Sequence, residues 1–191
     1  MTAEDPLPTP AAPRTDGYPE PESIRTTRED HRIAWLAALA IAIHIAEAAL
    51  PSPLPGIKPG LANVVTIAAL VRFGWGTAAW ISLLRVLMGS LLLGTFLSPT
   101  FMLSLSGALA SVATLGLASR LPGAGFGPIG YSVLAAMAHM AGQFTVAYYV
   151  FIRHPALLHL VPILMTAAVI FGLVSGIIVL MMLQQMRSPQ S

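Results

Sequence analysis

Charged residues are scarce in this chain. Asp, Glu, Lys and Arg together make up 9% of its 191 residues, whereas 55% of the residues are hydrophobic, and the mean hydropathy is +0.75. A soluble domain carries about a quarter charged residues. Because so few charges cannot cover a surface that faces water, the composition excludes a soluble globular domain and predicts an integral membrane protein.

Cysteine is absent altogether, and aspartate is absent after Asp30. The lack of cysteine excludes disulfides, zinc–thiolate sites, iron–sulfur clusters and cysteine nucleophiles. The lack of aspartate excludes, for this chain alone, both a Ser–His–Asp triad and the aspartate-rich magnesium sites with which prenyl diphosphate synthases hold diphosphate. No G-x-x-x-x-G-K-[ST] segment occurs, so P-loop binding of ATP is excluded. We therefore expect no catalytic residue, no metal and no cofactor, and an enzymatic role only as an accessory subunit.

The acidic residues that do occur are concentrated at the start of the chain. Seven of the eight lie in the first 32 positions, and residues 1–30 also hold six of the sixteen prolines. Such a segment buries too little apolar surface to offset its ordering entropy, so we expect residues 1–30 to form a disordered cytoplasmic tail. The basic residues beyond it are dispersed, which does not make a nucleic-acid-binding face.

The rest of the chain, residues 31–187, is expected to form a transmembrane helical domain. Glycine, proline and charged residues divide it into apolar stretches near residues 33–50, 60–73, 75–97, 99–119, 128–152 and 157–186. Most of these stretches are long enough for a bilayer core of about 30 Å. The pattern predicts an all-α, polytopic membrane bundle of about six helices, or five if the short second stretch is re-entrant. Pro162 is expected to kink the last helix.

The placement of lysine and arginine predicts the orientation, because cytoplasmic helix ends carry the excess of these residues. With the N-terminus inside, only Lys58 and Arg153 lie at outer helix ends. The inner ends hold Arg25, Arg28, Arg32, Arg72, Arg120 and Arg187. We therefore expect both termini in the cytoplasm, with the lipid bilayer between.

Arg85 is the most informative single residue. It lies in the middle of the third apolar stretch, where a central arginine costs at least about 2.5–3.5 kcal/mol on insertion scales. An ion pair, carbonyl groups, water or an anionic ligand must offset that cost. Glu47 is the only carboxylate within the apolar stretches, so an intramembrane Glu47–Arg85 pair is one interpretation and an anion-binding site is the other. His44 lies one turn before Glu47 on the same helical face.

Further polar residues could complete an anion-binding site. Residues 51–60 hold four prolines and two glycines, and such non-helical backbone must be buried in protein, face water or line a cavity. Lys58 in this loop could attract an anion, or could be a solvated lysine of a short turn. Asn63 and Ser82 could donate hydrogen bonds to the same ligand.

Small residues form a stripe along the first apolar stretch, because Ala34, Ala38, Ala42 and Ala46 recur every four residues. Small residues allow close helix approach in lipid, so the stripe is either an internal helix contact or a docking face for a membrane partner. Two later stretches carry polar and small residues at helical spacing, which line a pocket or hydrogen-bond between helices. These are Ser104, Gly107, Ser111 and Thr114, and then His139 and Gln143.

The segments PLPGIKPGLANVVTIAAL and RVLMGSLLLGTFLSPTFMLSLSGALAS carry a family resemblance. The chain resembles, over about residues 33–187, the bacterial membrane family labelled heptaprenyl diphosphate synthase component I, also called the Gx transporter family. That family is similar to the substrate-binding S components of energy-coupling-factor transporters. The resemblance implies six helices, a bacterial inner-membrane location, and docking of the alanine stripe on a membrane coupling subunit.

Three hypotheses follow for the function. The first is an S-component-like subunit that binds a small anionic or amphipathic substrate for uptake, energised by a partner ATPase and coupling subunit. In this hypothesis Arg85 and Lys58 supply charge, and Asn63 and Ser82 supply hydrogen bonds. The second is a non-catalytic membrane subunit of a polyprenyl diphosphate synthase system with a soluble prenyltransferase partner. The third is a structural scaffold in which Arg85 merely pairs with Glu47.

Overall fold

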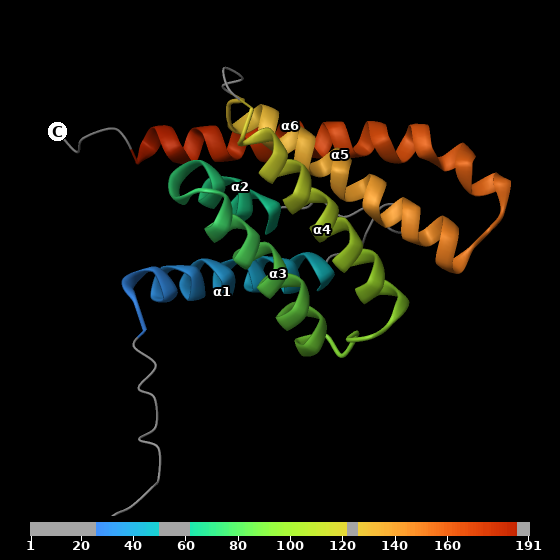
Figure 1. Cartoon of the computed structure of the whole chain (residues 1–191), viewed down its shortest axis with the longest axis horizontal. Helices are drawn as coiled ribbons and strands as arrows, with labels where there is room; N and C mark the ends of the chain where they lie inside the picture. Colours follow the sequence, from blue (N-terminus) through green and yellow to red (C-terminus); the bar gives the residue numbers. More distant parts are fainter. Residues whose placement is uncertain (1–25, 50–61, 122–125, 187–191) are drawn as a thin grey trace, which may run out of the picture.

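The computed structural model describes residues 26–49, 62–121 and 126–186, and all regular structure in these ranges is helical (Figure 1). The α-helices are α1 (Arg28–Ala49), α2 (Ala62–Phe73), α3 (Trp75–Leu92), α4 (Pro99–Ala118), α5 (Pro128–Val146) and α6 (Val161–Gln185). A π-helical turn, η1 (Ala147–Phe151), and a 3-10 helix, η2 (Pro155–Leu160), join α5 to α6. The predicted all-α class is confirmed. Most of the predicted tail lies outside the described residues.

Five of the described helices, α1, α3, α4, α5 and α6, are long and apolar enough to cross a membrane. The exception is α2, because its 12 residues extend about 18 Å, short of the hydrocarbon core of about 30 Å. The composition-based prediction of a membrane protein therefore agrees with the structure. The second apolar stretch forms a helix that is too short to span on its own.

The helices alternate in direction, and the start of α1 lies on the same side of the molecule as the end of α6 (Figure 1). We call this the terminal end, since α1 begins and α6 ends there. The guanidinium of Arg32 near the start of α1 lies 4.3 Å from the ring centre of Phe73 at the end of α2. The indole N–H of Trp75 at the start of α3 donates to the carbonyl of Val112 near the end of α4, at 2.9 Å. These contacts agree with an arrangement in which both termini lie on one side.

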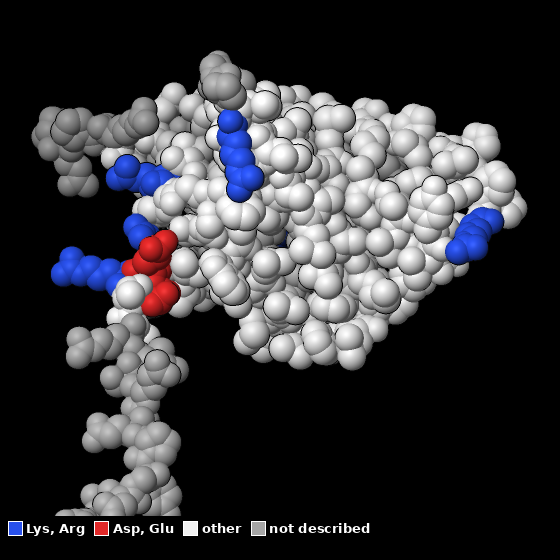
Figure 2. Space-filling model, in the orientation of Figure 1, with Lys and Arg blue, Asp and Glu red and all other residues white. Residues whose placement is uncertain are grey.

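Charged side chains are few on the visible face. Figure 2 shows acidic and basic groups gathered at the terminal end, one basic group near the upper edge and one at the opposite end, with a largely uncharged surface between them. The helices also expose many large apolar residues, such as Leu109 on α4 and Ile170 and Ile177 on α6. Such an apolar surface suits contact with lipid tails, because exposed leucine and isoleucine carry no free-energy cost in hydrocarbon.

Local sequence signals explain where several helices begin. Thr27 and Asp30 form a reciprocal cap at the start of α1, in which the Thr27 N–H donates to Asp30 Oδ2 at 2.7 Å and the Asp30 N–H donates to Thr27 Oγ1 at 3.2 Å. Pro99 follows the cap residue Ser98 and starts α4. The last apolar stretch is helical over Pro155–Gln185, and Pro162 lies in the first turn of α6, directly after the 3-10 helix η2. The first turn of an α-helix tolerates proline, and the kink expected at Pro162 stays a prediction.

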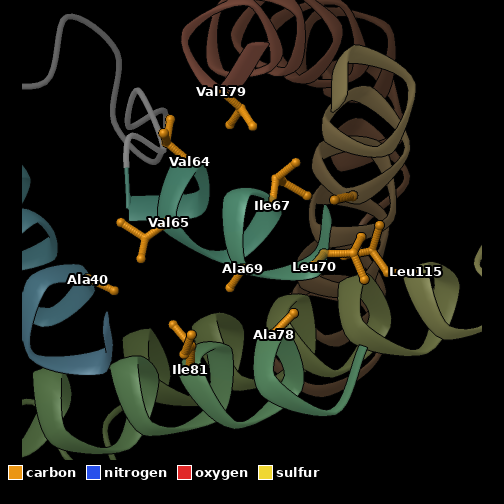
Figure 3. Packing of buried hydrophobic residues seen from close by; sticks show 11 residues of the cluster. Ala40, Val64, Val65, Ile67, Ala69, Leu70, Ala78, Ile81, Leu115 and Val179 are labelled. Atoms are coloured by element: carbon orange, nitrogen blue, oxygen red, sulfur yellow. The ribbon is translucent and has the colours of Figure 1, made fainter. Parts of the chain in front are cut away.

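The apolar core is built around α2, which contacts α1, α3, α5 and α6. Figure 3 shows Ile67 of α2 between Val179 of α6 and Leu115 of α4, with Ala40 of α1 and Ile81 of α3 on the other sides. The side chains of Ile67, Ile81, Leu115 and Val179 are almost fully buried. Because α2 ends at the terminal end, this core fills the half of the bundle on that side.

Candidate functional site

Polar side chains follow the apolar core along three helices, in the direction away from the terminal end. On α1, His44 comes one turn after the core residue Ala40. On α3, Arg85 comes one turn after Ile81, and on α5, His139 lies one turn beyond the core alanine at position 135. Four polar side chains thus lie beyond the apolar core that surrounds α2. We call His44, Glu47, Arg85 and His139 the polar cluster.

Arg85 is buried, with 7% of its surface exposed, and Glu47 is buried to a similar degree at 5%. The two charges are close enough to act on each other. Even so, the Nε–H of Arg85 has no hydrogen-bond partner in the part of the chain that the structure describes. A buried donor without a partner costs about 1–3 kcal/mol, and more when the group is charged. The cluster therefore has one strong donor that no described residue satisfies.

Both histidines of the cluster pack against glycines of a neighbouring helix. A Cβ atom at Gly89 would come within 2.9 Å of His44 Cδ2, and a Cβ at Gly107 would come within 2.8 Å of His139 ring atoms. The His139 ring also lies within electrostatic range of Arg85 and His44. The absence of a side chain at these two glycines thus allows the imidazoles to lie deep between helices, near Arg85.

The other predicted ligand residues have different placements. Ser82 is buried one turn before Arg85 on α3. Asn63 is half-buried in the first turn of α2, at the end of that helix which points away from the terminal end and carries the positive end of the helix dipole. Lys58 and the rest of the loop 51–60 lie outside the described residues. The described residues contain no group of three or more side chains that could hold a metal ion.

The alanine stripe lies on the outer surface of α1. Ala34, Ala38, Ala42 and Ala46 are all exposed, whereas Ala37, Ala40 and Glu47 on the other side of the helix are buried. Within the described chain the stripe is therefore not an internal helix contact. This leaves a smooth surface of α1 free to meet lipid or another membrane helix.

Sequence reasoning placed Glu47 and Arg85 together but did not join His139 to them. The relevant features of the sequence were Gly107 and His139, each of which belongs to a polar face of its own helix. Their pairing depends on α4 and α5 running antiparallel side by side, with Gly142 against Ser106 and His139 against Gly107. Nothing in the spacing of single helices shows which helices are neighbours.

Comparison with known proteins identifies the family. A family model described as heptaprenyl diphosphate synthase component I matches residues 36–182, a range that contains the whole polar cluster. No curated protein and no solved structure matches the chain. Because the family model covers most of the chain, this membrane protein belongs to the heptaprenyl diphosphate synthase component I family.

Proposed function

We propose that the chain is a substrate-binding membrane subunit that holds the anionic group of a small amphipathic molecule in its polar cluster. The observation that carries this proposal is buried Arg85, whose Nε–H lacks a partner among the described residues. A guanidinium presents a planar set of donors that matches carboxylate and phosphate oxygens. Buried Ser82 and half-buried Asn63 would add hydrogen bonds, and Lys58 would add a second positive charge.

The subunit acts with partner proteins rather than as an enzyme of its own. The sequence has no aspartate after Asp30, and Glu47 is its only acidic residue beyond that position. One carboxylate cannot hold magnesium on a diphosphate, since magnesium in such sites takes several oxygen ligands. We therefore assign binding to this chain and any chemistry or energy supply to its partners.

Uptake across the membrane is the first setting for this binding role. The exposed alanine stripe on α1 favours it, because small residues on a lipid-facing surface suit close contact with a helix of another subunit. In this setting the chain is S-component-like. A membrane coupling subunit docks on Ala34, Ala38, Ala42 and Ala46, and an ATPase supplies the energy.

Isoprenoid synthesis is the second setting, and the name of the family favours it. In this setting the chain is the non-catalytic membrane subunit of a polyprenyl diphosphate synthase system. The polar cluster would hold the diphosphate of a prenyl substrate, and a soluble aspartate-rich prenyltransferase would perform the reaction. Both settings use the same anion-binding residues and differ in the partner.

The orientation proposed for either setting is N-terminus and C-terminus in the cytoplasm of a bacterial cell, in the inner membrane. Arg28 begins α1, Arg72 lies in the last turn of α2 and Arg120 follows α4, so all three belong to the terminal end. Arg153 lies between η1 and η2 at the opposite end. This excess of arginine favours the cytoplasm for the terminal end.

The test is native mass spectrometry of the protein purified in lipid nanodiscs, followed by the same measurement on Arg85→Gln. We expect a bound anionic small molecule in the wild type, and at least about a tenfold loss of occupancy in Arg85→Gln, as for loss of a charged hydrogen bond. Arg120→Gln, at an exposed position after α4, is the control and should keep the ligand.

The scaffold hypothesis makes the opposite forecast. If Arg85 only pairs with Glu47, then Arg85→Gln and Glu47→Gln should both unfold the protein, and no ligand should be found in the wild type. Co-purification then separates the two settings. An ATPase with a coupling subunit supports uptake, and a prenyltransferase whose activity requires both chains supports isoprenoid synthesis.

A further inference from the structure

We propose that the first turn of α2 and the hydroxyl of Thr66 complete the anion-binding site, so that the anionic group of the ligand caps this helix inside the membrane. This inference rests on the proposed function of the polar cluster. It adds backbone N–H groups and one further side chain to the site. Its consequence is that a carboxylate built into the chain at the start of α2 should take the place of the ligand.

Helix α2 begins inside the protein rather than at a membrane surface. It ends at the terminal end, and its 12 residues extend about 18 Å, so its first turn lies within the hydrocarbon depth of about 30 Å. Val64 and Val65 in this turn are buried. The first four N–H groups of a helix have no partner within the helix, and lipid tails offer none at this depth. The start of α2 therefore needs an acceptor from elsewhere.

The residues directly before α2 supply no side-chain cap. They are Pro59, Gly60 and Leu61, none of which has a side-chain acceptor. Helix α4, by contrast, is preceded by Ser98, whose hydroxyl accepts from the Phe101 N–H. An anion at the start of α2 would accept from the N–H groups that the helix itself leaves unpaired, and the positive end of the helix dipole favours it there.

Arg85 lies at the same height as this first turn. Gly74 is the one residue between α2 and α3, and Asn63 lies eleven residues before it while Arg85 lies eleven residues after it. Figure 3 shows Ile81 of α3 on the side of α2 to which Ala69 points. Arg85 follows Ile81 by one helical turn and so projects from the same face of α3. The buried Arg85 Nε–H, which has no partner among the described residues, is therefore directed at the start of α2.

Thr66 adds a hydroxyl to the same place. The residue is 1% exposed, and its Oγ1 has no hydrogen-bond partner within the described ranges. Thr66 lies one turn after Asn63, and Cα–Cβ bonds tilt toward the start of a helix, so its side chain leans toward the first turn. An anionic group that caps α2 would satisfy this hydroxyl together with the Arg85 guanidinium.

The experiment measures binding of decanesulfonate, whose charge does not change with pH, to the full chain in phosphatidylcholine nanodiscs by calorimetry. Decanol shares the alkyl chain but has no charge, so it is the reference probe, and empty nanodiscs give the background. We expect the wild type to bind decanesulfonate at least about tenfold more tightly than decanol, since hydrogen bonds to charged groups are the strong ones. No preference of the wild type for decanesulfonate overturns both the proposed function and this inference.

The decisive variant is Asn63→Asp, because its carboxylate would occupy the place of the bound anion. We expect a higher melting temperature than that of the wild type in detergent without probe, and at least about tenfold weaker binding of decanesulfonate. The control Thr100→Asp, which adds the same charge at an exposed position in the first turn of α4, should keep the affinity. Wild-type affinity of Asn63→Asp, or a lower melting temperature, overturns this inference. If Arg85→Gln still loses the probe, the proposed binding function stands.

Two further variants each remove a single donor. Ala62→Pro deletes one N–H of the first turn of α2, where proline is tolerated, and Thr66→Val deletes only a hydroxyl. Each should weaken binding of decanesulfonate by about tenfold without lowering the melting temperature. The control Ser132→Ala removes another buried hydroxyl without a described partner, on α5 against Gly176 of α6, and should leave binding unchanged. Wild-type affinity of both Ala62→Pro and Thr66→Val contradicts the inference.

The same titration in nanodiscs that contain phosphatidylglycerol identifies the source of the anionic group. Weaker binding of decanesulfonate there assigns the site to a lipid headgroup, because the lipid competes for the start of α2. Unchanged binding assigns it to a water-soluble amphiphile.

Discussion

The imidazole of His139 occupies the space that a side chain at Gly107 would need. A Cβ atom at position 107 would lie 2.8 Å from three ring atoms of His139. These residues come from neighbouring antiparallel helices, α5 and α4, so their contact sets both the spacing of the helices and the position of the ring. Gly107 therefore has a positioning role for the polar cluster.

Substitution Gly107→Ala should displace the His139 ring and lower the stability by about 1–3 kcal/mol, the usual cost of overpacking. The matched control is Gly76→Ala on α3, where a Cβ meets nothing within 4 Å. Alanine favours helix at such a position by up to about 1 kcal/mol. In detergent, the melting temperature should therefore be lower than that of the wild type for Gly107→Ala and higher for Gly76→Ala. Equal melting temperatures of the two variants would show that the His139 ring moves aside without a loss of stability.

Substitution Gly176→Ala should be more damaging than Gly107→Ala. A Cβ at Gly176 would lie 2.6 Å from the Cα of Ile129, which is backbone of α5 and cannot rotate away. Helices α5 and α6 would have to separate, and we expect a loss at the upper end of the range of about 1–3 kcal/mol for overpacking. The measurement is unfolding in a mild detergent at several temperatures. A variant as stable as wild type would mean that α5 and α6 pack less closely than described.

Substitution Trp75→Phe removes the indole N–H that donates to the Val112 carbonyl at 2.9 Å. We expect a loss of about 1 kcal/mol, the net value of a typical hydrogen bond. Trp80→Phe on the same helix is the control, because Trp80 is 59% exposed and should change stability by less. Tryptophan fluorescence during unfolding reports both variants. An equal effect at the two positions would speak against a specific role of the Trp75 hydrogen bond.

Substitution Ala38→Leu or Ala42→Leu should weaken docking of the proposed coupling subunit without harming the fold. Both positions are exposed on α1, so leucine there replaces no buried side chain, but it makes a surface suited to close helix contact less smooth. Ala113→Leu, exposed on α4, is the control. Affinity purification with quantitative mass spectrometry should show loss of the partner only for the α1 variants. If both α1 variants retain the partner, the alanine stripe is not part of the docking surface.

The sequence predicts the membrane class, the helical fold and most helix ends because these depend on local properties. Apolar length marks the spanning helices, and a cap residue followed by proline at Ser98–Pro99 marks the start of α4. Local chemistry does not by itself fix the role of Pro162. A proline signals a break in a long apolar stretch, but it does not say whether the helix bends there or begins there.

The polar cluster was predictable only in part, because it depends on which helices are neighbours. Arg85 stands out in any window of the sequence, since a central arginine in a spanning helix needs compensation, and Glu47 is the sole acid available. His139 has no such signal. Its proximity to Arg85 arises from the packing of α3 on α4 and of α4 on α5, which the hydrophobic pattern of each helix leaves undetermined.

The central position of α2 has a consequence for permeability. Ile67 of this short helix packs with Ile81, Leu115 and Val179, and all four side chains are almost fully buried. Among the described residues, apolar side chains therefore fill the core of the terminal half. For the ligand proposed at Arg85, a route through that half would require α2 to shift against its neighbours.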